Sequence, residues 1–151
     1  MRKKEITEKI KLKAIELGFS DCGITQSRNL LEEEIHYQIW LDKGCNADMN
    51  FLKNSKSKRL NPQNFVENSK SVISVLYNYF PKTTKQNSKY KISKYAISED
   101  YHKIVSSKLN LLLNYINSEI QPVNGKIFTD SSPVLEKALA KSLARPMVFR
   151  F

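Results

Sequence analysis

The sequence of 151 residues is poor in cysteine, glycine and histidine, and each shortage excludes a class of function. Its two cysteines, Cys22 and Cys45, are too few for a disulfide framework and too few for an iron–sulfur cluster, which needs four thiolates. We interpret both as small buried hydrophobic residues. The four glycines are isolated, so the glycine-rich phosphate-binding loops are absent. The two histidines lack the spacing of zinc ligands, which disfavours metal-dependent hydrolysis and predicts no metal site.

Long hydrophobic runs are also absent. No apolar stretch approaches the roughly 18 residues of a membrane span. The first residues are mostly charged and pass into a mixed charged and apolar pattern, without the hydrophobic segment of a secretory signal. We therefore expect a soluble, cytoplasmic protein with no membrane partner. The length corresponds to one domain by the usual range of about 100 to 200 residues.

Acidic residues are few relative to basic ones, 15 against 25, which gives a net charge of +10. Ten basic residues and one acidic residue, Glu67, lie between Lys53 and Lys94. This excess predicts a surface that attracts polyanions, and the tyrosines between the lysines would suit stacking on nucleic-acid bases. A solvated lysine surface without any ligand explains the same composition.

Helix-like and strand-like segments alternate along the chain. Helices are predicted at 6–17, 30–43, 101–116 and from 133 onward, and strands at 19–24, 72–77 and 126–128. Gly18 is expected to end the first helix, and Ser132 with Pro133 to begin the last. This order predicts an α/β (α+β) fold, a layered sheet flanked by helices.

Four segments carry more detailed expectations. Leu31, Ile35 and Ile39 are expected to share one face of the second helix. Turn-forming residues predict an exposed loop over 54–62, and a loop without apolar residues over 82–89. The apolar, β-branched segment 72–77 predicts a central strand that is covered on both faces.

Three places hold side chains that could carry chemistry. Asp130 follows a predicted strand and precedes a helix, where α/β folds present groups to ligands, although a capping aspartate is the simpler interpretation. Arg59 could clamp a phosphate or carboxylate, or be a solvated surface arginine. The segment from Ser93 to His102 is dense in hydrogen-bonding side chains, and His102 is equally explained as a helix-surface histidine.

Two segments of the second half form a specific pair. One is Ser93-Lys94-Tyr95-Ala96, followed by Asp100-Tyr101-His102-Lys103, and the other is Asp130-Ser131-Ser132-Pro133-Val134-Leu135-Glu136. Further matches in the same order are Leu17-Gly18-Phe19, Gly23-Ile24, Trp40-Leu41-Asp42, Met49, Lys58-Arg59, Pro62 and Val72-Ile73-Ser74-Val75. Together they resemble the N-terminal, cobalamin-binding part of the epoxyqueuosine reductase family.

That resemblance implies a function. Enzymes of the family remove the epoxide oxygen of epoxyqueuosine in the anticodon loop of tRNA, with electrons passing from two 4Fe–4S clusters to cobalamin. The resemblance implies that Asp130 is the proton donor and that Arg59, Ser93, Tyr95 and His102 surround cobalamin. A general acid suits this chemistry, because opening an epoxide leaves an alkoxide that must be protonated.

The chain departs from the family in two places. Ser98 and Glu99 stand where the family has a glycine before the Asp-Tyr-His motif. After Lys141 the glycine-rich motif and the cluster cysteines of the family are missing. We therefore expect a cobalamin-binding domain at 1–141 with a divergent tail at 142–151, a truncated form that is inactive alone and depends on a separate iron–sulfur donor chain. A non-catalytic tRNA- or cobalamin-binding module and an unstable truncated product are the alternatives.

Overall fold

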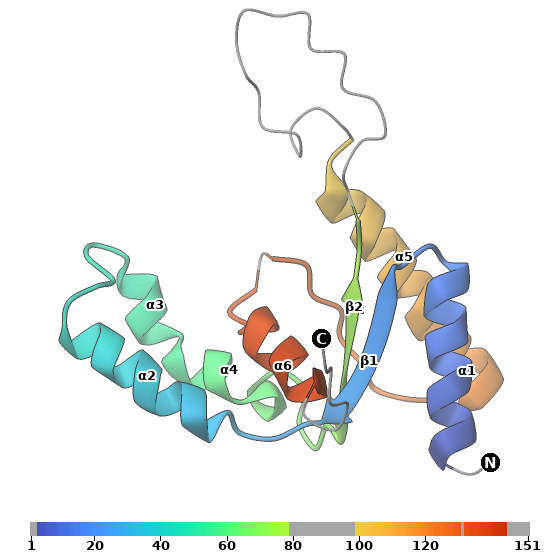
Figure 1. Cartoon of the computed structure of the whole chain (residues 1–151), viewed down its shortest axis with the longest axis horizontal. Helices are drawn as coiled ribbons and strands as arrows, with labels where there is room; N and C mark the ends of the chain where they lie inside the picture. Colours follow the sequence, from blue (N-terminus) through green and yellow to red (C-terminus); the bar gives the residue numbers. More distant parts are fainter. Residues whose placement is uncertain (1–2, 79–98, 131, 145–151) are drawn as a thin grey trace, which may run out of the picture. The chain divides into compact units, whose positions relative to one another are not determined.

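The computed structural model describes residues 3–78, 99–130 and 132–144 and shows a mixed α/β fold. Its sheet, within these residues, pairs β1 (Asp21–Gln26) with β2 (Ser71–Leu76). The Ser20 amide donates to the Leu76 carbonyl at 2.7 Å, and the Ser27 amide donates to the Lys70 carbonyl at 3.0 Å. The strands therefore run antiparallel (Figure 1), and the predicted mixture of helices and strands is confirmed.

The sheet is smaller and more open than the sequence indicates. Val72, Ile73 and Val75 are only half-buried, and Leu76 is 62% exposed, so the prediction of a central strand covered on both faces is wrong. The predicted strand at 126–128 is also wrong, since these residues have no strand structure. Phe128 is instead held by its side chain, with its ring centre 5.0 Å from that of Phe65.

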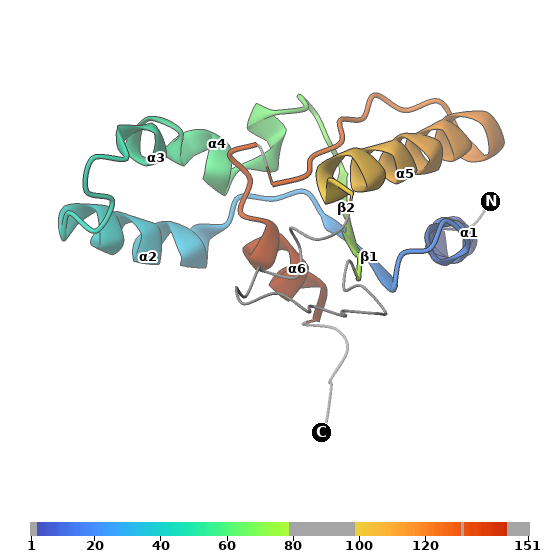
Figure 2. The same cartoon turned by 90° about the horizontal axis from the view of Figure 1, so that it is seen from above.

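One compact unit comprises residues 1–22 and 75–123. Its helices α1 (Lys3–Glu16) and α5 (Tyr101–Tyr115) lie side by side (Figures 1 and 2), and the π-helical turn η3 (Ile116–Ile120) continues α5. Each helix buries residues at helical spacing, and these are Ile10, Ala14, Val105 and Leu112. Burial of these apolar side chains is the main stabilising contribution in this unit.

Gly18 ends α1 as the sequence predicts. Its φ of +86° lies in the left-handed region, which glycine adopts without the steric penalty of a Cβ atom. Lys108 of α5 donates from its ammonium group to the Leu17 carbonyl at 2.5 Å and lies 5.2 Å from the ring centre of Tyr77. A cation therefore meets the negative end of the α1 dipole.

The second compact unit comprises residues 23–74 and 124–151. Its helices are α2 (Leu31–Asp42), α3 (Asn50–Asn54), α4 (Lys56–Leu60), the short 3-10 helix η1 (Pro62–Asn64) and α6 (Glu136–Ala144). The α3–α4 segment runs alongside α2 (Figure 2). Leu30, Leu60 and Leu139 form the buried cluster, with Val72, Val134, Leu135 and Ala138 packed against it.

Two expectations for this unit need correction. The predicted loop at 54–62 is largely helical, because Leu60 is anchored in the buried cluster and stabilises α4. The last helix begins at Glu136 rather than at Pro133, although Leu135, Ala138 and Leu139 do face the core. The apolar face of α2 is exposed, by 66% at Leu31, 63% at Ile35 and 47% at Ile39.

The two cysteines differ in their environments. Cys22 is buried as predicted, and this burial raises the pKa of its thiol to about 11. Cys45 is exposed, so the prediction of a buried residue is wrong there. The expectations for Ser93, Tyr95, the loop at 82–89 and most of the tail lie outside the described residues.

Candidate functional site

Asp130 lies in the irregular segment that leads into α6. Its φ of +50° is in the left-handed region, which aspartate tolerates better than most side chains other than glycine. The Asp130 amide donates a hydrogen bond of 3.0 Å to Oε1 of Glu136, the first residue of α6. The backbone at Asp130 is therefore tied to the start of a helix whose apolar face is packed in the buried cluster.

The side chains of Asp130 and Glu136 also interact. Burial raises the pKa of Glu136, and the negative charge of Asp130 and a hydrogen bond between the two side chains raise it further. The hydrogen bond from the Asp130 amide opposes this rise. Glu136 therefore retains its proton to higher pH than an ordinary glutamate does.

The sequence patterns do not indicate the contact between Glu136 and Asp130. Helical contacts join residues three or four apart, whereas this contact spans six residues across the irregular start of a helix. The available signal was the segment Asp-Ser-Ser-Pro-Val-Leu-Glu, in which a helix start separates the two acids.

Arg59 lies in the last turn of α4 and is half-buried, not a fully solvated arginine. Its Nε–H donates to the Ser55 hydroxyl oxygen at 2.9 Å, and the Ser55 hydroxyl donates to the Phe51 carbonyl at 2.6 Å. Burial raises the pKa of Tyr37, and the positive charge of Arg59 opposes the rise. The guanidinium group is thus held at its Nε, while its two terminal nitrogens are the donors that match a phosphate or carboxylate.

His102 lies in the first turn of α5, in the other compact unit. Its Nδ1 is 2.8 Å from Oδ1 of Asp100, and this same oxygen accepts from the His102 amide at 3.0 Å and so caps the helix. The hydrogen bond with His102 is the main cause that lowers the pKa of Asp100. The imidazole ring also stacks on Tyr101, at 4.1 Å between ring centres.

The structure thus brings one candidate residue, Asp130, into contact with a second carboxyl group, that of Glu136. Asp130 and Arg59 belong to the same compact unit, and His102 belongs to the other. Among the described residues, no group of three or more histidine, cysteine, aspartate or glutamate side chains could hold a metal ion. Within the same residues, no helix is long and apolar enough to cross a membrane.

A shallow hollow of about 290 Å³ lies beside α4 and η1. Its lining is polar apart from Leu60, and consists of Asn29, Glu34, Lys56, Ser57, Leu60, Asn61 and Asn64. The Lys56 ammonium is 3.5 Å from Glu34 and donates to Gln38 at 2.7 Å.

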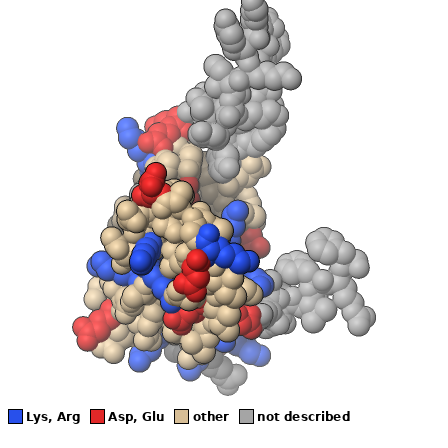
Figure 3. Space-filling view, turned by 90° about the vertical axis from the view of Figure 1, so that its left-hand side faces the viewer, with Lys and Arg blue, Asp and Glu red and all other residues tan. Residues whose placement is uncertain are grey.

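The face seen in Figure 3 mixes basic and acidic side chains. On this face, the described residues therefore do not form a purely basic surface.

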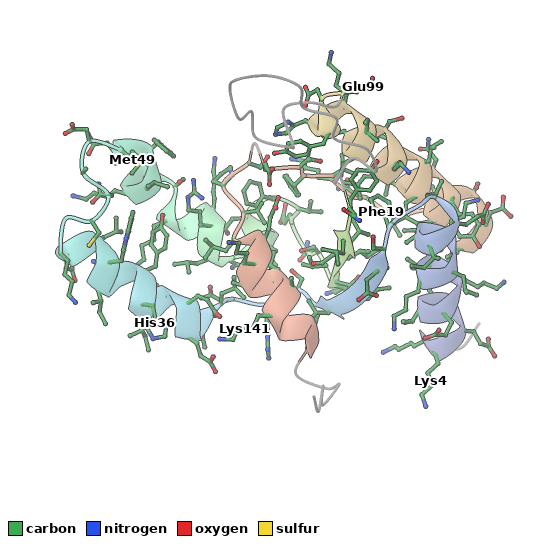
Figure 4. The ribbon with its side chains drawn as sticks, turned by 45° about the horizontal axis from the view of Figure 1, so that its top comes forward. Lys4, Phe19, His36, Met49, Glu99 and Lys141 are labelled. Atoms are coloured by element: carbon green, nitrogen blue, oxygen red, sulfur yellow. The ribbon has the colours of Figure 1, made fainter. Side chains whose placement is uncertain are left out.

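The α2–α3 segment adds exposed side chains of other kinds. Figure 4 shows His36 on the outer side of α2 and Met49 close to the start of α3. Met49 and Phe51 are 44% and 60% exposed. His36 and His102 are not among the residues that line the hollow.

Comparisons with known proteins agree on one family. The model described as "Epoxyqueuosine reductase QueG, DUF1730" matches residues 59–131, a range that includes Arg59, His102 and Asp130. Curated epoxyqueuosine reductases of Cellulophaga algicola and Leadbetterella byssophila are each 43% identical to 91% of this chain. The Escherichia coli enzyme is 35% identical over 91% of the chain.

This chain is much shorter than those relatives. The matched part covers 45% of the Cellulophaga protein, 46% of the Leadbetterella protein and 38% of the Escherichia coli protein. A crystal structure of an epoxyqueuosine reductase with an epoxyqueuosine-modified stem loop of tyrosine tRNA matches 91% of this chain and 37% of that protein. The TM-score is 0.76 at 17% identity, which supports a shared fold.

Proposed function

From the relationship of this chain to the epoxyqueuosine reductases, we propose that residues 1–141 are the part of such an enzyme that binds cobalamin and supplies the proton donor. The observation that carries the proposal is the carboxyl pair, because Asp130 is the residue that the resemblance implies as the acid and its neighbour Glu136 has a raised pKa. The remaining residues, 142–151, are a divergent tail.

The proposed reaction removes the epoxide oxygen of epoxyqueuosine in a tRNA anticodon loop, in the cytoplasm. Two electrons and two protons convert the epoxide to an alkene, and the oxygen leaves as water. Cleavage of the first carbon–oxygen bond leaves an alkoxide, to which the Asp130 carboxyl donates its proton by general acid catalysis. Bound cobalamin would supply the electrons at the epoxide carbon.

The described residues that would hold cobalamin have suitable chemistry. Arg59 presents a guanidinium group that is fixed through Ser55, and a fixed donor loses less conformational entropy on binding than a mobile one. His102 is held in the same way by Asp100. Ser93 and Tyr95 complete the proposed set.

Iron–sulfur clusters do not fit this chain. The whole sequence has two cysteines, whereas each cluster needs four thiolate ligands. We therefore assign the electron supply to iron–sulfur clusters held outside these 151 residues, and we expect the present chain to be inactive without such a donor.

The test is an assay of queuosine formation in epoxyqueuosine-containing tRNA. Purified chain with cob(II)alamin should form no queuosine alone, and should form it when an artificial low-potential reductant is added. Asp130→Asn should lower the rate by at least about 100-fold, the usual contribution of a general acid, without loss of cobalamin binding. Queuosine formation that is unchanged in Asp130→Asn would contradict the assignment of the acid and favour a binding module.

A further inference from the structure

We propose that Glu136 is a positioning residue for Asp130, because its carboxylate accepts a hydrogen bond from the Asp130 amide and so holds the aspartate backbone. This inference rests on the proposed function, in which Asp130 is the acid. The hydrogen bond between Glu136 and Asp130 can be measured on the purified chain without cofactor or tRNA.

The first argument is the backbone geometry. A non-glycine residue is disfavoured at a φ of +50°, so the surroundings must hold Asp130 in this conformation. The bond of 3.0 Å from the Asp130 amide to Glu136 supplies that restraint. Loss of the acceptor should therefore release the Asp130 backbone as well as its carboxyl group.

The second argument is the placement of Glu136 on α6. Leu139 is 5% exposed in the buried cluster, and Leu135 and Ala138 pack against the same cluster. Glu136 is consequently the first residue of a helix that is anchored in the core. An anchored partner can hold a neighbouring side chain more firmly than a loop residue can.

The third argument is electrostatic. The negative charge of Asp130 and a hydrogen bond between the two side chains both raise the pKa of Glu136. Other charged side chains on the elements packed here are Arg28, Glu32, Glu33, Lys137 and Lys141. The charge that shifts the pKa of Glu136 is nevertheless that of Asp130. The side chains of Glu136 and Asp130 are therefore in contact, in addition to the hydrogen bond from the Asp130 amide.

Carboxyl-carbon NMR titration of the purified full chain tests this directly. In the wild type, the Glu136 resonance should titrate with a midpoint above the ordinary value of 4.5 for glutamate. In Asp130→Asn, the Glu136 midpoint should fall toward 4.5. A Glu136 midpoint that is the same in both proteins would overturn the proposed contact.

The Asp130 amide resonance separates positioning from a general loss of structure. Glu136→Gln keeps an acceptor oxygen and should preserve the amide hydrogen bond, whereas Glu136→Ala should speed hydrogen exchange at that amide by at least about tenfold. Glu67→Gln is a matched control, because Glu67 is an exposed glutamate of the same unit. Equal exchange in Glu136→Ala and wild type, with both folded, would contradict the role.

The queuosine assay gives the functional readout. Glu136→Ala removes the acceptor of the Asp130 amide and should lower the rate of queuosine formation, whereas Glu136→Gln keeps an acceptor oxygen and should restore the rate. A rate in Glu136→Ala equal to that of Glu67→Gln would refute the inference. Failure of the chain to bind cobalamin would instead contradict the proposed function and leave the NMR result valid.

Discussion

Gly18 shows how a single residue links two helices of one compact unit. A Cβ atom at this position would lie 2.8 Å from the Lys108 ammonium, which donates to the Leu17 carbonyl at the end of α1. The positive φ alone disfavours any side chain. The lysine would also have to move and give up a charge-assisted hydrogen bond.

A comparison of two glycine variants tests this contact. Gly44 also has a positive φ, of +66°, but has open space around its Cα atom. Gly44→Ala should therefore lower the free energy of unfolding by about 1 kcal/mol, the backbone cost, and Gly18→Ala by about 1 kcal/mol more for the lost hydrogen bond. Urea denaturation measures both values, and equal losses would show that Lys108 moves at no cost.

At this scale the sequence predicts backbone features better than side-chain partners. The glycine after α1 has a local signature, and the prediction that Gly18 ends this helix is confirmed. The contact of Glu136 with Asp130 depends on the path of the chain between them, which no helical or strand periodicity encodes. The exposure of Cys45 has the same explanation, because composition alone does not place a loop residue.

Among the elements, α2 and α4 show that local sequence pattern does not determine burial. In α2 the spacing of Leu31, Ile35 and Ile39 correctly predicts a helix with an apolar face, but periodicity does not reveal whether a neighbour covers that face. In α4 the turn-forming composition predicts a loop, and the burial of Leu60 overrides it. Tertiary packing decides both cases.

Two alanine variants test that conclusion. Leu60 is 3% exposed and Ile35 is 63% exposed. Leu60→Ala should therefore lower the free energy of unfolding by about 2 to 5 kcal/mol, whereas Ile35→Ala should change it by less than about 0.5 kcal/mol. The measurement is chemical denaturation followed by circular dichroism. A larger loss for Ile35→Ala would mean that the apolar face of α2 is covered in solution.

For the whole molecule, the small number of cysteines limits the cofactors that these 151 residues can hold. Two cysteines exclude a cluster within the chain, and the chain spans less than half the length of the curated relatives it matches. The mixed α/β fold was predictable from the order of elements and is confirmed. The number of strands was not, because the segment at 126–128 is held through Phe128 and Phe65 instead of strand pairing.

Cobalamin binding tests the central claim most directly. We predict that the purified chain, shown to be folded by circular dichroism, binds cob(II)alamin saturably with one cobalamin per chain in equilibrium dialysis. Arg59→Gln should weaken this binding by about tenfold, the effect of losing one charge-assisted hydrogen bond, while the exposed Lys53→Gln control should not. A folded chain that shows no saturable cobalamin binding would contradict the account.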